Sequence, residues 1–162
     1  MTAEQIAADA ASSGTADREL VLTREFDAPR ELVFRAYTDP EHLPHWWGPD
    51  GFTNTVHELD VRPGGRWRFT MHGPDGTDYP NRIVYREIAR PERLEYAHGD
   101  DVEDDPGLMQ VTVTFDDLGG RTRVTMRTVL PTAAHRQAAE QFGAVELGNQ
   151  TLRRLAAHLK TM

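Results

Sequence analysis

The chain contains no cysteine, which excludes disulfides, thiolate metal sites and a cysteine nucleophile. Serine occurs only at Ser12 and Ser13, so no serine nucleophile is available in the rest of the chain. The sequence also lacks a Gly-x-Ser-x-Gly elbow, a phosphate-binding loop and the Gly-rich fingerprint of dinucleotide-binding proteins. The residue content therefore supports no particular catalytic mechanism.

Positive charge and long apolar runs are also scarce. The sequence has 18 Lys and Arg residues against 26 Asp and Glu residues, and its net charge is −8. No basic stripe offsets this excess, so we expect no nucleic-acid partner. No apolar run approaches the ~20 residues of a membrane helix. The first residues lack the basic start and apolar core of a signal peptide. We therefore expect a cytoplasmic protein without membrane insertion.

The 162 residues are enough for one domain with a sizeable core. Residues 1–17 are rich in Ala, Ser and Thr, and Ile6 is their only bulky hydrophobe. Such a segment has almost nothing to bury, which predicts a disordered leader. The folded domain is expected at residues 18–162.

The segment from Thr132 to Leu159 predicts a single long amphipathic helix with Thr132 as its N-cap. Its apolar positions follow the helical period and comprise Ala134, Ala138, Phe142, Val145, Leu152, Ala156 and Leu159. Gly148 and Asn149 interrupt this face. Because Gly148 has no side chain, we expect the helix to leave space over a sheet and to act as the lid of a cavity. The alternative is that side chains of the sheet fill that space.

The rest of the chain predicts an antiparallel sheet. A strand over Glu19–Phe26 precedes a helix over Pro29–Thr38 and a short helix over Glu41–Trp46. Six strands are then expected over Thr53–Val61, Arg66–His72, Tyr79–Ile88, Arg93–His98, Met109–Phe115 and Arg121–Leu130. Apolar and polar residues alternate, which predicts one buried face formed by Trp67, Phe69, Met71, Val111, Val113, Val124 and Met126. Strands and helices are segregated along the chain, so the fold class is α+β.

Several local features have alternative interpretations. The apolar pattern of Thr53–Val61 changes face between Val56 and Leu59, which predicts a β-bulge. Trp46 and Trp47 are adjacent and form either a structural plug or an aromatic wall at a pocket mouth. The acidic run at residues 98–107 predicts a solvated, mobile hairpin loop.

Metal ligands are sparse. His42 and His45 have a metal-binding spacing, but the sequence fixes no third ligand, so we expect no metal and no cofactor.

The sequence resembles a known family through four stretches at residues 26–52, 60–76, 85–96 and 141–159. They include Trp-Trp-Gly-Pro at residues 46–49 and Arg-Pro-Gly-Gly at residues 62–65. The family is named for its homology to the heat shock protein 90 ATPase activator and belongs to the START-like SRPBCC superfamily. The resemblance covers about Glu19 to Leu159. It implies a helix-grip (Bet v 1-like) fold, in which a seven-stranded antiparallel sheet curves around a long C-terminal helix and two short helices lie between the first two strands.

The resemblance also implies a function, because the superfamily binds hydrophobic or aromatic small molecules between helix and sheet. The family has no shared catalytic residues to transfer. We therefore expect a small-molecule binding module that is a monomer or weak homodimer. The alternatives are a cyclase- or hydrolase-type enzyme that uses the same cavity, and a module that interacts with protein partners in chaperone regulation or stress response.

The expected cavity has an apolar lid at Phe142 and Val145, a polar anchor at Asn149 and hydroxyl groups at Tyr85 and Tyr96. A Gly148→Leu change is expected to fill it without loss of stability. The complete set of expected ligand-binding residues is Trp46, Trp47, Trp67, Phe69, Met71, Tyr85, Tyr96, Val113, Met126, Phe142, Val145, Gly148 and Asn149.

Overall fold

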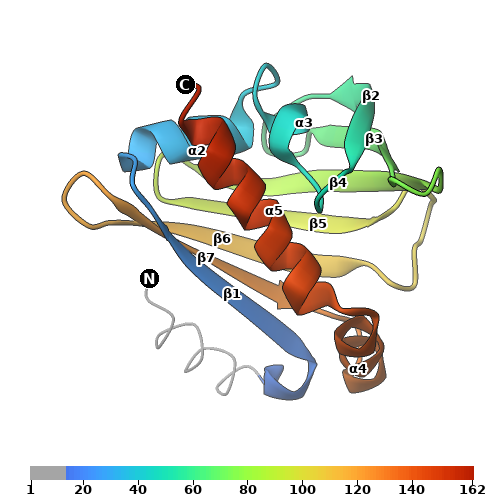
Figure 1. The fold of residues 1–162 in the computed structure, drawn as a ribbon. Helices are drawn as coiled ribbons and strands as arrows, with labels where there is room; N and C mark the ends of the chain where they lie inside the picture. Colours follow the sequence, from blue (N-terminus) through green and yellow to red (C-terminus); the bar gives the residue numbers. More distant parts are fainter. Residues whose placement is uncertain (1–13) are drawn as a thin grey trace.

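The computed structural model describes residues 14–162, which form a seven-stranded antiparallel sheet curved around helix α5 (Figure 1). The strand order is β1-β7-β6-β5-β4-β3-β2. The strands are β1 (Glu19–Phe26), β2 (Thr53–Leu59), β3 (Arg66–His72), β4 (Asp78–Ala89), β5 (Arg93–Asp100), β6 (Met109–Asp117) and β7 (Thr122–Val129). The helices are η1 (Ala16–Arg18), α2 (Arg30–Thr38), α3 (Leu43–Trp46), α4 (Ala133–Phe142) and α5 (Ala144–Leu159). The expected α+β helix-grip fold is confirmed.

The alternation of the strands places the expected residues on the inner face. Trp67, Phe69, Val113 and Val124 are fully buried, and Val111 is only 4% exposed. The predicted bulge in β2 is also present, because its pairing with β3 shifts between Val56 and Glu58. A bulge changes which face later residues occupy, and this explains the change of face in the sequence.

The densest part of the core lies where α2 and the second half of α5 meet the sheet. Phe115 of β6 makes edge-on ring contacts with Phe34 at 5.1 Å and with Tyr37 at 5.2 Å between centroids. The buried side chains of α5 all lie in its second half, namely Leu152, Leu155 and Leu159. This uneven packing of α5 leaves its first half free to border a cavity.

Part of the expected leader can be placed. Residues 1–13 lie outside the described residues. Thr15, in contrast, is buried, and its hydroxyl donates to Glu19 Oε1 at 2.6 Å. Arg127 Nη2 donates to the same hydroxyl at 3.2 Å and also pairs with Glu19. Thr15, which composition alone assigned to the leader, therefore packs against the sheet.

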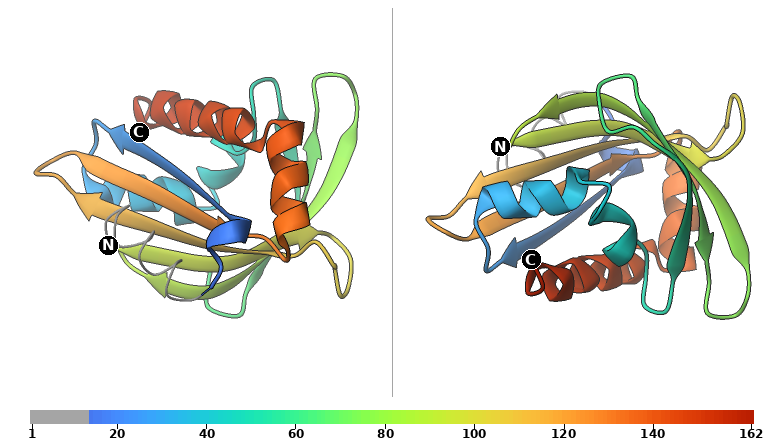
Figure 2. Two further views of the ribbon diagram at one scale, coloured as in Figure 1. Left: turned by 90° about the horizontal axis from the view of Figure 1, so that it is seen from below. Right: turned by 90° about the horizontal axis from the view of Figure 1, so that it is seen from above.

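The expectation of one continuous C-terminal helix is wrong. Thr132 caps the first helix as predicted, since its Oγ1 accepts from the backbone N–H of His135 at 3.1 Å. Helix α4 then ends at Gly143, which has φ = 94° and donates its N–H to the carbonyls of Ala139 and Glu140. This left-handed glycine is a common helix terminator. Figure 2 shows α4 crossing one end of the sheet in a different direction from α5.

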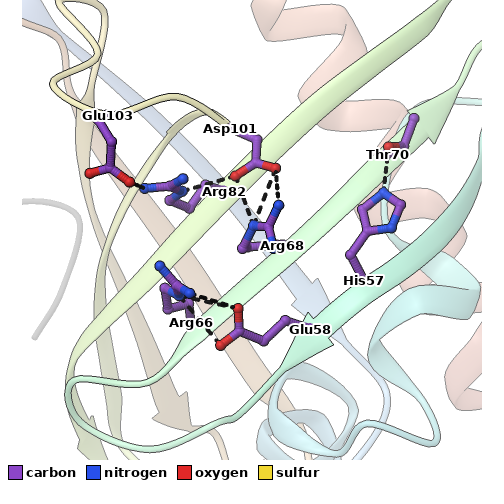
Figure 3. Close-up of polar contacts among 8 residues, drawn as sticks. All are labelled: His57, Glu58, Arg66, Arg68, Thr70, Arg82, Asp101 and Glu103. Atoms are coloured by element: carbon purple, nitrogen blue, oxygen red, sulfur yellow. Dashed lines mark hydrogen bonds and ion pairs between the residues drawn. The ribbon is translucent and has the colours of Figure 1, made fainter.

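The acidic run after β5 is fixed to the sheet and is not a free loop. Asp101 accepts hydrogen bonds from Arg68 Nη2 at 2.9 Å and from Arg82 Nε at 3.0 Å, and Arg82 also bonds Glu103 at 2.9 Å (Figure 3). The hydrogen bond from Arg68 is the main cause that lowers the pKa of Asp101 to about 2. The loop is solvated as expected, with Val102, Glu103 and Asp104 exposed, and outward-facing arginines of β3 and β4 tie it to the sheet at Asp101 and Glu103.

A substitution at Gly143 tests the helix break. No heavy atom lies within 4 Å of a β-carbon added there, so Gly143→Ala tests backbone conformation alone. We expect a loss of about 1–2 kcal/mol in the free energy of unfolding, because a left-handed conformation is costly for a residue with a β-carbon. Gly143→Asn should cost less, since Asn tolerates this conformation better. Urea unfolding measures both, and equal stability of Gly143→Ala and the parent would contradict the break.

Candidate functional site: a cavity between helix and sheet

A cavity of about 400 Å³ lies between the first half of α5, α4 and the inner face of the sheet. Its walls are nearly all apolar, and no Asp, Glu, Lys or Arg side chain lines it among the described residues. The sheet contributes Leu20, Leu22, Met71, Tyr96, His98, Met109, Val111, Met126 and Thr128. The helices contribute Tyr37, Trp46, Ala139, Phe142, Ala144, Val145, Leu147, Gly148 and Thr151, and connecting segments contribute Trp47, Gly48, Pro49 and Leu130.

The tryptophan pair is both buried and part of the cavity wall. Trp46 is 1% exposed, and its indole N–H donates to the carbonyl of Ala36 at 3.0 Å. Trp47 is 8% exposed and lies edge-on against Trp67 at 5.2 Å between centroids. Both side chains line the cavity. The two interpretations of the sequence, a plug and a wall, therefore describe the same pair of side chains.

Arg154 of α5 holds the segment after the tryptophans in place. Its Nη1 donates to three successive carbonyls, those of Trp47 at 3.2 Å, Gly48 at 2.8 Å and Pro49 at 3.0 Å. These bonds satisfy backbone acceptors that are not part of a helix or strand. Burial lowers the pKa of Arg154. Sequence reasoning did not identify this residue, because nothing in the chain order shows that α5 passes beside residues 47–49.

His98 is the main polar group of the cavity. Its Nε2 lies 2.8 Å from Asn81 Oδ1, and Asn81 Nδ2 donates to the carbonyl of Tyr79 at 2.8 Å. The second bond fixes the amide so that its oxygen faces His98, and therefore His98 donates its Nε2–H. Burial lowers the pKa of His98 to about 4, against an opposing effect of Asp105. The imidazole is therefore neutral at pH 7.

Two tyrosines add hydroxyl groups. The Tyr37 hydroxyl donates to Met126 Sδ at 3.6 Å, a weak interaction. The Tyr96 hydroxyl is buried and has no hydrogen-bond partner within residues 14–162. Burial raises the pKa of both groups, so both phenols are protonated at neutral pH.

Comparison with known families places this chain. The family model described as Activator of Hsp90 ATPase homolog 1-like protein matches residues 27–160, which is most of the chain. The chain belongs to this family. A comparison with curated proteins found no significant match.

Solved structures of bacterial proteins share the fold. A protein from Arthrobacter aurescens is 27% identical, with a TM-score of 0.83 over 91% of this chain and 89% of that chain. Protein Ms6760 from Mycobacterium smegmatis is 28% identical, with a TM-score of 0.78 over 88% and 91% of the two chains. Protein CV1439 from Chromobacterium violaceum is 29% identical, with a TM-score of 0.75 over 88% and 96%.

Both signature motifs of the family resemblance have structural roles here. The Trp-Trp-Gly-Pro motif forms one wall of the cavity. The Arg-Pro-Gly-Gly motif forms the turn between β2 and β3 and docks on β4. In this turn the Gly64 N–H donates to the carbonyl of Tyr85 at 2.8 Å, and the Tyr85 N–H donates to the carbonyl of Gly65 at 2.9 Å.

Eight of the expected ligand-binding residues line the cavity: Trp46, Trp47, Met71, Tyr96, Met126, Phe142, Val145 and Gly148. Phe142 and Val145 are 75% and 43% exposed, so they border its mouth and do not cover it from above.

The other expected residues do not line the cavity: Trp67, Phe69, Tyr85, Val113 and Asn149. Trp67 and Phe69 stack at 3.8 Å between centroids, and Trp47 packs edge-on against both, so it stands between them and the open space. Tyr85 is buried beside Tyr96, and Val113 is buried on the strand that contacts α2. Asn149 is one residue further round α5 than Gly148. Facing the core is therefore not sufficient to border the cavity.

Sequence reasoning missed other residues of the wall, including His98, Tyr37 and Leu22. A signal existed for each. His98 shares the inward face of β5 with Tyr96, and Leu22 follows the alternation of β1. Tyr37 lies on the apolar side of its helix. The sequence does not distinguish the inward-facing residues that border the cavity from those that are packed against other side chains.

Gly148 borders the cavity, but it does not leave open space beneath it. A β-carbon added there would lie well inside van der Waals contact with Leu22 Cδ1 of β1. A leucine at this position would require the end of the Leu22 side chain to move, so the effect of Gly148→Leu on stability stays a prediction. The glycine lets α5 approach β1 closely at this point, while the open volume lies to the side.

His42, His45 and His158 lie close together. His42 Nδ1 lies 3.0 Å from His158 Nε2, and the ring of His45 stacks on that of His158 at 6.4 Å between centroids. Within residues 14–162, no group of three His, Cys, Asp or Glu side chains is placed to hold a metal ion. In the same part of the chain, no helix is long and apolar enough to span a membrane.

Gly148→Leu tests the close approach of α5 to β1. We expect this change to lower the free energy of unfolding by about 1–3 kcal/mol through overpacking. The same change in a Leu22→Ala background should cost less, because the conflicting side chain has been removed. Chemical denaturation of the four proteins of this double-mutant cycle measures the coupling. Additive effects of the two substitutions would contradict the contact.

Proposed function

We propose that this protein binds a hydrophobic or aromatic small molecule in the cavity between α5 and the sheet. The observation that carries the proposal is the cavity itself, about 400 Å³ in volume and bordered by apolar side chains. Ligand pockets in proteins commonly measure about 300–1,000 Å³ and combine apolar walls with a few polar groups. The polar groups here include His98, Tyr37 and Tyr96.

The cavity supports binding better than catalysis. His98 is the candidate general base on the cavity wall, and burial lowers its pKa to about 4. A general base is most effective when its pKa lies near the working pH, so His98 is a weak base at neutral pH. Its partner is the amide of Asn81, which cannot stabilise an imidazolium as a carboxylate would.

The cavity also supports small-molecule binding better than protein binding. Phe142 is 75% exposed and is the most exposed large hydrophobic side chain in the described part of the chain. It lies at the cavity mouth, next to Ala139 and Val145 of the same wall. Its exposure is therefore explained by access to the cavity, without a protein partner.

A pair of tryptophan substitutions on α5 tests this function. Leu147 lines the cavity, whereas Glu146 is exposed and points away from it. Leu147→Trp should occupy the open volume and weaken binding of the neutral fluorescent probe N-phenyl-1-naphthylamine by about tenfold or more. Glu146→Trp introduces the same side chain at the neighbouring position and should leave the affinity within about twofold. Fluorescence titration measures both, with circular dichroism as the check of folding.

Two results would contradict the proposed function. The first is no saturable binding of the probe by the parent protein. The second is equal weakening by the two tryptophan variants, which would place the probe on the outside of α5.

A further inference from the structure

The cavity wall carries no charge that could balance an ionised ligand. No acidic or basic side chain lines it within residues 14–162. Arg154 contacts the segment after the tryptophans, but its Nη1 is already shared by three backbone carbonyls. Moving an ion from water into apolar surroundings without a partner is strongly unfavourable. The cavity is therefore suited to a neutral molecule.

Among the polar groups of the wall, the His98 imidazole offers a hydrogen-bond acceptor, beside the hydroxyl groups of Tyr37 and Tyr96. Asn81 Oδ1 takes the Nε2–H of His98, so the other ring nitrogen, Nδ1, carries no proton in the neutral imidazole. No hydrogen bond joins Nδ1 to any group within residues 14–162. A group that accepts but does not donate is matched by a ligand O–H or N–H and repels a ligand carbonyl or carboxylate.

Aromatic rings surround the same histidine. The ring of Trp47 lies edge-on at 6.1 Å and that of Phe69 lies tilted at 6.3 Å between centroids. Trp47 lines the cavity together with His98. Because Trp47 borders the open space, a flat aromatic ligand could make edge-on or offset contacts of the same kind with its ring.

We propose that the cavity selects neutral aromatic molecules that carry a hydroxyl or N–H donor, with His98 Nδ1 as the acceptor. The inference rests on the proposed function, since it names the ligand class for the same cavity. His98 then acts as a specificity-determining residue, and the apolar walls supply most of the affinity.

A matched set of naphthalenes tests the inference. 1-Naphthol offers a donor, 1-methoxynaphthalene offers only an acceptor, and 1-naphthoate is an anion at pH 7. For the parent protein, we expect 1-naphthol to bind about threefold to tenfold more tightly than 1-methoxynaphthalene, which is the range of one neutral hydrogen bond. 1-Naphthoate should bind most weakly. Isothermal titration calorimetry measures the three affinities.

Two variants assign the preference to His98. His98→Phe keeps an aromatic ring at this position but removes the acceptor nitrogen. The ratio of the affinities for 1-naphthol and 1-methoxynaphthalene should therefore fall to about one. His57→Phe is the matched control, because His57 bonds Thr70 on the exposed outer face of the sheet (Figure 3). It should keep the ratio of the parent.

A second measurement does not depend on a variant that folds. In ¹⁵N spectra of the parent protein, the Nδ1 resonance of His98 should shift on addition of 1-naphthol and stay in place with 1-methoxynaphthalene. Equal affinities for the neutral pair, together with an unmoved Nδ1 resonance, would overturn the inference and leave the proposed function standing. Tightest binding of 1-naphthoate would also overturn it. Failure of all three probes to bind would overturn both.

Discussion

Helix α5 is anchored at one end only, and the cavity depends on this. Leu152, Leu155 and Leu159 are buried in the core where α2 also packs. The first half of the helix has no fully buried side chain and contacts the sheet closely at Gly148, opposite Leu22. The second half of α5 is therefore held by buried leucine side chains, whereas its first half approaches the sheet at Gly148. A curved sheet and a straight helix cannot touch along their whole length, and the space that remains is the cavity.

The break at Gly143 completes this arrangement. If the chain had continued as a helix before residue 144, α4 would have extended α5 beyond the sheet. Instead the left-handed glycine turns α4 across the end of the cavity, where Ala139 and Phe142 reach its wall. On the other side, Arg154 joins α5 to residues 47–49, and Trp47 separates the open space from Trp67 and Phe69. The cavity is therefore bounded by segments that are far apart in the sequence.

The layers of the fold could be predicted from sequence because each strand carries its own evidence. Alternation along Arg66–His72 places Trp67 and Phe69 inside without knowledge of any other strand. The break at Gly143 was missed because the helical periodicity of the apolar residues continues across it. The sequence does not show that the backbone of Gly143 adopts a left-handed conformation and turns the chain. The ion pairs of Arg68 and Arg82 with Asp101 were missed for a similar reason. These side chains come together only when β3, β4 and β5 have paired. The residues that line the cavity are harder still to predict from sequence. They depend on which inward side chain covers another, as Trp47 covers Phe69.

The most direct test of the account is to locate a bound probe by its contacts with methionine methyl groups. Met71, Met109 and Met126 line the cavity, whereas Met162 packs against the core elsewhere. In protein labelled with ¹³C at the methionine methyl groups and saturated with N-phenyl-1-naphthylamine, intermolecular nuclear Overhauser effects should connect the probe to Met71, Met109 and Met126. Contacts confined to Met162, or no contact with the three cavity methionines at saturation, would contradict the account.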